Sequence, residues 1–298
     1  MLGWLPRLAL LNATRKPART VLTAGMVVAG VALLIVAMSW LDGIWSDIIG
    51  RSTDAGGHVL VQTRTYAERA ALMPLYENIA EMAPVLAAVR ATPGVVAAYA
   101  TIESGVTVSV GEEIGDVFGL AVGGDRRWFT ESAKVDSNLV EGRWFAADDE
   151  LVLGWTLVTS TGAKLGDEVL VLGQTQDGAM SPIKGRLVGI VRAGSAQIDR
   201  KVYVPLERMQ YLADIPDGAI SVVAYGTGHM DARALGPVLR AVPALADYSV
   251  RAWDEVAPWD GMLPTMRGIR SMLYFIVVFL AALGVWNTML MSVMERTT

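Results

Sequence analysis

The residue types that most often carry catalysis are few in this sequence. Its 298 residues include no cysteine and two histidines, His58 and His229, each of which stands beside a glycine. The lack of cysteine excludes disulfide bonds, thiol catalysis and a cysteine-ligated metal. Isolated histidines of this kind are typical of surface positions. We therefore expect no active site built on histidine or cysteine.

Patterns for nucleotide binding and for an activated nucleophile are also absent. There is no G-x-x-x-x-G-K-[ST] stretch that could hold ATP phosphates, and no G-x-S-x-G. Ser195 follows Gly194 but has no histidine near it in the sequence. The acidic run 148–150 lacks the alternating ligands and the glycine of a calcium loop, which favours a solvated turn before a strand. We expect no catalytic residues, no cofactor and no metal.

Charge is scarce and unevenly distributed. The chain is 53% hydrophobic and 18% charged, with a mean hydropathy of +0.40, whereas soluble domains carry about a quarter charged residues. Residues 20–41 and 271–294 contain no charge, and about 20 helical residues cross a membrane. A buried core helix would be shorter, and no small-residue cleavage site of a signal peptide follows the first segment. We expect two transmembrane helices.

Basic residues before the first apolar segment predict the topology. Arg7, Arg15, Lys16 and Arg19 occur in a stretch without acidic residues, which places the N-terminus in the cytoplasm by the positive-inside rule. Residues 43–266, with 28 acidic and 18 basic side chains, would then be extracytoplasmic, in a multi-pass protein of the bacterial inner membrane. Their negative charge argues against binding nucleic acid.

Apolar patterning continues past both predicted spans and predicts a stalk. Leu41, Ile44, Trp45, Ile48 and Ile49 keep helical spacing beyond residue 41. The approach to the second span has a matching stripe at Met262, Met266, Ile269 and Leu273. We expect an interfacial helix at 1–19, stalk segments at 42–56 and 257–270, and the start of a cytoplasmic region at 295–298.

The segment between the stalks has the pattern of an α+β domain. Two split βαβ units are predicted, with strands at 57–63, 95–110, 219–225 and 248–252 and helices at 72–90 and 231–241. Between them, short strands punctuated by glycine and aspartate predict an inserted β-rich subdomain, with a hairpin tip at Asp177-Gly178. The fold class is thus an α+β membrane protein with two transmembrane helices extended into a stalk. Its periplasmic domain has parts at 57–111 and 215–256 and an insertion at 112–214.

Small residues recur every four positions within the predicted spans. Gly25 and Ala29 do so in the first span, and Gly284, Thr288 and Ser292 in the second, where Asn287 adds a buried amide. Small-xxx-small faces allow helices to approach closely, and buried amides bond to neighbouring helices. We expect helix packing there, although lipid-facing helices with incidental small residues remain the alternative.

Several stretches resemble the FtsX-like ABC transporter permeases, which include MacB-type exporters and lipoprotein-releasing permeases. They are LALLNATRKPARTVLT, LVEGRWFAADDELVLGWTLVTSTGAKLGDEVLVLGQ, GRLVGIVRAGSAQIDRKVYVPLERMQYL, RAWDEVAP and GVWNTMLMSVMERTT. The resemblance spans the whole chain and keeps the order of the family's segments. In the family the pattern continues past this point into a coupling helix and further spans, so the coupling element lies outside these residues.

The resemblance implies a mechanism and a set of partners. A separate ABC ATPase would close two permease subunits, in a homodimer or heterodimer, and the stalk would carry that motion to the periplasmic domain. An amphiphile from the membrane lipid would enter at a stalk mouth formed by Leu41, Ile44, Trp45, Ile48, Leu263, Met266 and Tyr274. In lipoprotein-releasing relatives a hairpin grips a periplasmic carrier or adaptor protein, and the corresponding residues here are Gly178, Met180 and Pro182.

Two functions of different class therefore remain. The first is a permease subunit that extracts or exports a lipoprotein, lipid-like or amphiphilic substrate. The second is a non-transporting membrane regulator that relays the ATPase state to a periplasmic partner such as a cell-wall hydrolase. The large extracytoplasmic segment with its insertion favours transport.

Overall fold

The chain folds as two compact units. The computed structural model describes residues 17–111, 117–228 and 232–297. Unit 1 combines Met1–Ile49 with Pro258–Thr298, and unit 2 comprises Gly50–Ala257. The interfacial helix expected in the first 16 residues, and His229, lie outside the described residues.

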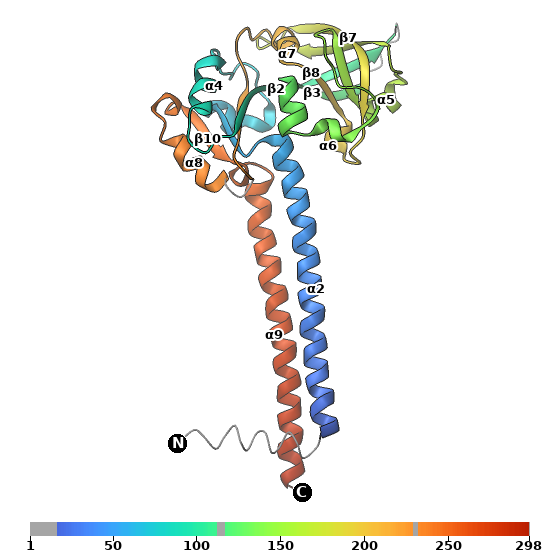
Figure 1. The fold of residues 1–298 in the computed structure, drawn as a ribbon, viewed down its shortest axis with the longest axis vertical. Coiled ribbons are helices and arrows are strands. Elements are labelled where there is room, and N and C mark those ends of the chain that lie inside the picture. Colours follow the sequence, from blue (N-terminus) through green and yellow to red (C-terminus); the bar gives the residue numbers. More distant parts are fainter. Residues whose placement is uncertain (1–16, 112–116, 229–231, 298) are drawn as a thin grey trace. The chain divides into compact units, whose positions relative to one another are not determined.

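Unit 1 contains most of two long helices, which lie side by side (Figure 1), and α2 continues from Gly50 into unit 2. Helix α2 spans Pro17–Gly56, 40 residues, and α9 spans Trp259–Thr297, 39 residues. Within them, Val28–Gly56 and Trp259–Gly284 are long and apolar enough to cross a membrane. Two long apolar helices were predicted, one extending beyond residue 41 and the other beginning before residue 271, and both are confirmed. Their insertion in a membrane stays a prediction.

Unit 2 is built on one mixed sheet. Its described strands follow the order β10-β1-β9-β2-β3-β8-β5-β7-β4, and β6 pairs with both β2 and β7. Pairing is antiparallel from β10 to β3, and the parallel pairs are β3 with β8 and β5 with β7. The strands are β1 (Val59–Thr63), β2 (Ala97–Val110), β3 (Val117–Gly124), β4 (Leu139–Gly142), β5 (Glu150–Gly154), β6 (Glu168–Gln174), β7 (Met180–Val191), β8 (Lys201–Pro205), β9 (Ser221–Tyr225) and β10 (Tyr248–Ala252).

Short helices cover this sheet (Figure 1). They are α3 (Arg64–Arg69), α4 (Met82–Arg90), α5 (Trp155–Thr161), α6 (Ala196–Asp199), α7 (Leu206–Ala213) and α8 (Ala232–Arg240), with single turns at Ala70–Leu72, Trp128–Ser132, Val135–Asn138, Pro243–Leu245 and Trp253–Glu255. Helix α7 packs closely on β3 because Gly123 has no side chain. A Cβ atom there would lie 2.3 Å from the Met209 side chain. A fully buried core containing Ile102, Leu157 and Leu212 lies beneath these helices.

The predicted strands are confirmed, but the helix predicted at 72–90 is wrong over its first half. Met73 adopts a left-handed conformation with φ 47°, and Pro74 follows it. A residue before proline is disfavoured in the right-handed helical region, so the helix cannot run through this point. Ile79 instead forms a β-bridge with Ala219, and α4 begins at Met82. The sequence also gave no sign of β4, α5 and α7.

The strands of the predicted insertion extend the same sheet. β3, β5, β7 and β8 continue the strand order from β2, and residues 50–257 form a single compact unit. The boundaries proposed at 111/112 and 214/215 stay predictions. The predicted hairpin is present, with Gln174 opposite Met180 and Gly178 in the turn at φ +84°.

Candidate functional site

The C-terminal end of α2, from Gly50 onward, belongs to unit 2 and is bonded to side chains within that unit. The Tyr225 hydroxyl donates to the Asp54 carbonyl oxygen at 2.7 Å, and Trp128 Nε1 donates to the Tyr225 hydroxyl oxygen at 2.8 Å. Both aromatic side chains are buried, at 5% exposure. The last four carbonyl groups of a helix have no partner within the helix. Tyr225 therefore satisfies a carbonyl group that α2 itself leaves open.

One further contact completes this arrangement, which we call the α2 clamp (Asp54, Trp128, Lys134 and Tyr225). Lys134 Nζ lies 3.4 Å from the Asp54 carboxylate. Burial raises the pKa of the Tyr225 hydroxyl, so the phenol remains protonated and can donate its hydrogen bond. The clamp joins α2 to β9 and to the segment after β3, which are distant in sequence.

Glycine ends α2 at the clamp. Gly57 has φ +89°, and its N–H donates to the Thr53 carbonyl oxygen at 2.8 Å. A left-handed residue after the last helical residue is a common helix stop, and glycine adopts it without steric cost. A Cβ atom at Gly57 would also approach the Val223 Cβ to 2.9 Å. The chain can thus turn from α2 directly into β1.

An aromatic cluster connects the clamp to the opposite half of the sheet. Trp128 and Phe129 have ring centroids 4.7 Å apart, and the Phe129 ring lies 5.3 Å from Trp144 and 5.7 Å from Phe145. Tyr203 on β8 packs edge-on against Phe129 at 5.6 Å. Phe129 is fully buried. Contacts between aromatic rings add about 0.5–1.5 kcal/mol each beyond burial, so this cluster ties the segment after β3 firmly to β8 and to the 143–147 loop.

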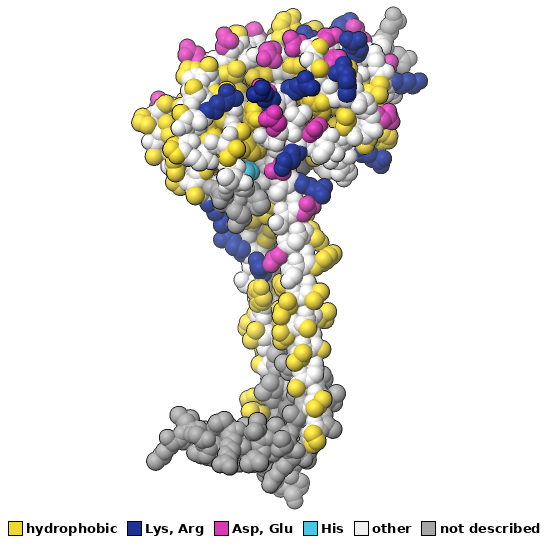
Figure 2. Space-filling view, in the orientation of Figure 1, with side chains coloured by type: hydrophobic (Ala, Val, Ile, Leu, Met, Phe, Trp, Pro, Cys, Tyr) yellow, Lys and Arg dark blue, Asp and Glu magenta, His cyan; other side chains and the backbone are white. Residues whose placement is uncertain are grey.

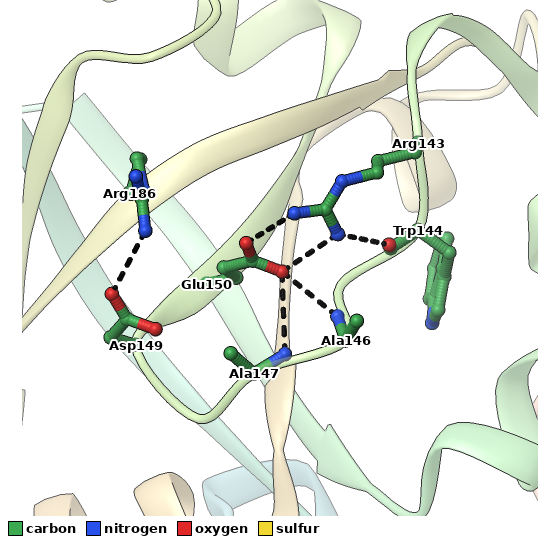
Figure 3. A network of polar contacts seen from close by, with 7 residues as sticks. All are labelled: Arg143, Trp144, Ala146, Ala147, Asp149, Glu150 and Arg186. Atoms are coloured by element: carbon green, nitrogen blue, oxygen red, sulfur yellow. Dashed lines mark hydrogen bonds and ion pairs between the residues drawn. The ribbon is translucent and has the colours of Figure 1, made fainter.

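A buried carboxylate fixes the 143–147 loop (Figure 3). Glu150, at 5% exposure, forms a two-pronged ion pair with Arg143 and accepts from the Ala146 N–H at 2.9 Å and the Ala147 N–H at 3.3 Å. The hydrogen bonds from Arg143, followed by that from Ala146, lower the pKa of Glu150 to about 2. Figure 3 shows Trp144 leaving the same loop in another direction. The ion pair therefore holds the backbone from which Trp144 and Phe145 reach the aromatic cluster.

The Glu150 contacts and the position of His58 correct two predictions. We expected residues 148–150 to form a solvated turn before a strand, and Asp148 and Asp149 do lie exposed in a turn. Glu150 instead points inward, where Arg143 pairs with its charge and two N–H groups bond its carboxylate. Among the described residues, no group of three or more acidic or histidine side chains is placed to hold a metal. We expected His58 at the surface, but it is 5% exposed and accepts from the Gly226 N–H at 3.1 Å, with its ring 5.2 Å from Tyr225.

The predicted stalk-mouth residues differ in exposure. Ile44, Ile48 and Tyr274 are 37%, 41% and 43% exposed. The other predicted residues, Leu41, Trp45, Leu263 and Met266, are half-buried. The half-buried positions follow helical spacing along each helix, and we call these two stripes the helix seam. The seam comprises Leu34, Met38, Leu41, Trp45 and Ile49 on α2, and Met262, Leu263, Met266, Leu273 and Val277 on α9.

The predicted packing residues lie on open helix surface where the structure describes them. Gly25, Ala29 and Gly284 are exposed, and a Cβ atom at Gly25 or Gly284 would meet no other atom within 4 Å. The side chains of Asn287, Thr288 and Ser292 lie outside the described residues. Their role in packing against further helices stays a prediction.

The predicted carrier-contact hairpin is exposed and borders a polar groove. Gly178, Met180 and Pro182 are exposed, Met180 at 59%. A groove of about 520 Å³ beside the hairpin is lined by Thr175, Ser181, Glu207, Gln210, Tyr211, Asp214, Pro216 and Asp217. Its polar and acidic lining does not suit an acyl chain, because buried carboxylates need polar partners. Contact with a carrier stays a prediction.

The clamp and the aromatic cluster lie within a segment that matches a known family model. The model of the MacB-like periplasmic core domain matches residues 20–233, which is well over half of the chain. The chain belongs to this family. The finding confirms the resemblance to FtsX-like and MacB-type permeases, and it covers α2, the clamp and most of the sheet.

Two solved structures match most of the chain at low sequence identity. The extracellular domain of the noncanonic ABC-type transporter YknZ from Gram-positive bacteria is 15% identical, with a TM-score of 0.46, and the match covers 65% of this chain and 98% of that one. The periplasmic region of MacB from Actinobacillus actinomycetemcomitans is 12% identical, with a TM-score of 0.46 and coverages of 72% and 94%. No curated protein matches the sequence.

Proposed function

We propose that this chain is the permease subunit of an ABC transporter that moves a lipoprotein, lipid-like or amphiphilic substrate with energy from a separate ATPase subunit. The family assignment supports this proposal, since the matched domain is the MacB-like periplasmic core. The two apolar helices support it as well, because each has the length of a membrane span. The chain itself has no phosphate-binding loop, so hydrolysis belongs to the partner.

The observation that carries the proposal is the continuity of α2 into the clamp. Residues from Pro17 to Gly56 form one helix, and within unit 2 its last turn is bonded to Tyr225 and Lys134. Because the last turn is bonded to β9 and the segment after β3, movement of the helix would reach the sheet directly.

The exposed surface of unit 1 supports the proposed partners. Hydrophobic side chains predominate on the visible face of the paired helices (Figure 2), with Trp40 at 70% and Phe275 at 69% exposure. Soluble proteins rarely expose continuous apolar surface of this extent. Membrane lipid and a second permease subunit would cover it, and the small residues at Gly25 and Gly284 would allow close helix approach.

Paired assays of ATP hydrolysis and substrate release test the proposal. The chain, its ATPase and a fluorescent triacylated peptide would be placed in proteoliposomes. Ile48→Asp introduces a charge into the exposed apolar stripe, which is strongly unfavourable where lipid or a partner helix keeps water from the carboxylate. We expect peptide release to fall about tenfold or more while ATP hydrolysis continues.

Ser46→Asp is the matched control, because it introduces the same charge on the other side of α2. We expect it to leave both activities near the parental level. If Ile48→Asp releases the peptide at the parental rate, α2 does not transmit the motion. Unit 2 would then act as a binding module for a periplasmic partner.

A further inference from the structure

An ion pair joins the two helices of unit 1. Arg270 on α9 donates to the Asp42 carboxylate on α2 at 2.7 Å, and both side chains are about half exposed, at 47% and 49%. The Tyr274 side chain, one turn further along α9, interacts with the same guanidinium group. Tyr274, which the sequence placed at the stalk mouth, thus contacts the arginine of this ion pair from within α9.

The pair lies at equivalent places on the two helices. Asp42 directly follows the uncharged segment 20–41, and Arg270 directly precedes the uncharged segment 271–294. In the proposed topology both residues therefore lie at the outer boundary of the membrane. Two charges at this depth are expensive when left alone and favourable when paired, because the surroundings are less polar than bulk water.

Within the predicted spans, the helix seam cannot set the register of α2 against α9 by itself. Apart from Trp45 its residues are aliphatic or methionine, and lipid tails offer such side chains equally good contacts. Within a membrane the hydrophobic effect therefore gives no preference for one helix register over another. A directional ion pair does favour one register, because a slip of α2 along α9 by one helical turn moves the two charged groups about 5.4 Å apart.

Arg267 shows that a basic residue at this end of α9 does not pair by default. It lies one turn before Arg270, and its guanidinium donates to the Leu263 carbonyl oxygen of its own helix at 3.4 Å. Both residues are arginines on α9. Among the hydrogen bonds of the described residues, that of Arg270 reaches α2, whereas that of Arg267 stays within α9. This difference supplies an internal control.

We propose that the Asp42–Arg270 ion pair locks the register of α2 and α9 at the outer membrane boundary, so that the two helices of one subunit move as a single body. Any opening in the stalk would then occur between subunits and not between α2 and α9. The inference rests on the membrane topology given under the proposed function, but its test requires neither substrate nor ATPase.

Distance measurement between spin labels tests the lock. The chain has no cysteine, so Ser46→Cys and Ala282→Cys place labels at two exposed positions. With Asp42 opposite Arg270, the labelled residues are separated by about 16 helical rises, or roughly 24 Å along the axis. The labelled full chain would be diluted into excess unlabelled chain in lipid nanodiscs and measured by double electron–electron resonance.

We expect one narrow distance distribution in the parent. Asp42→Asn and Arg270→Gln should each broaden it or shift it by about 5 Å, one helical turn. Arg267→Gln should leave it unchanged, and the double reversal Asp42→Arg with Arg270→Asp should restore the narrow distribution. The inference is overturned if both single variants keep the parental distribution, if Arg267→Gln broadens it equally, or if the reversal fails to restore it. These outcomes leave the Ile48→Asp assays unaffected, so the two proposals can fail separately.

Discussion

Unit 2 buries most of its large hydrophobic side chains, whereas unit 1 exposes many of its own. In unit 2, Phe129 and Ile102 are fully buried, and the clamp and the Arg143–Glu150 pair supply specific polar contacts inside the fold. In unit 1, large apolar side chains such as Trp40 and Phe275 are about 70% exposed. Unit 2 therefore contains the interactions that define its own structure, whereas unit 1 depends on lipid or other helices to cover it.

If unit 2 is stabilised by its own internal contacts, a substitution in the aromatic cluster should give the largest loss of stability. Phe129→Ala would leave a cavity at the centre of the cluster and should lower the free energy of unfolding of unit 2 by about 3–5 kcal/mol. Thermal unfolding of the full chain in detergent would measure this loss. Phe118→Ala, at a position 64% exposed, is the matched control and should cost less than about 1 kcal/mol. Equal losses would mean that the cluster is not a specific support.

The clamp should give the next largest effect. Tyr225→Phe removes the hydroxyl group that bonds Asp54 and Trp128, which leaves a buried indole N–H and a helix carbonyl group without this partner. A buried polar group left unsatisfied costs about 1–3 kcal/mol. Chemical denaturation would measure the change, with Tyr76→Phe at a 58% exposed position as a control. A variant as stable as the parent would show that α2 is held in unit 2 by other contacts.

Acid should weaken unit 2 through Glu150. The pKa of Glu150 is lowered in the fold to about 2 from an ordinary 4.5, so the unfolded chain takes up the proton first as the pH falls. The stabilisation is present above about pH 4.5 and is lost as the pH falls toward 2. The melting temperature of the parent should thus converge with that of Glu150→Gln over this window.

Asp149→Asn changes the neighbouring carboxylate, which is 66% exposed and pairs with Arg186. This variant should keep the pH profile of the parent. A constant difference between the parent and Glu150→Gln from pH 6 to pH 2 would show that the network does not hold the carboxylate in its charged form.

The sequence revealed the features of the chain that depend on local pattern. Uninterrupted apolar runs predicted α2 and α9, and alternation with glycine and aspartate predicted most strands and the hairpin at Gly178. Helix α4 was placed too early because apolar periodicity continued through Pro74, where the backbone turns left-handed. Pro74 was the signal in the sequence that the helix could not begin before this point.

The clamp could not be predicted because its bonds join positions far apart in the sequence. Tyr225 and Asp54 are 171 residues apart, and nothing in either neighbourhood indicates the other. Glu150 looked like part of a solvated acidic turn because local sequence does not show that Arg143 lies opposite it. The pairing of Arg270 with Asp42 was missed for the same reason, since these residues are 228 positions apart.

Thiol labelling in intact cells tests the central claim most directly, namely that unit 1 crosses the membrane and unit 2 lies outside the cytoplasm. Single cysteines would be introduced at Met180, which is 59% exposed in unit 2, and at Ala13 before the first span. With any outer membrane permeabilised, an impermeant maleimide should label Met180→Cys, and it should label Ala13→Cys only after cell lysis. Labelling of Ala13→Cys in intact cells with protection of Met180→Cys would contradict the topology and, with it, the proposed transport function.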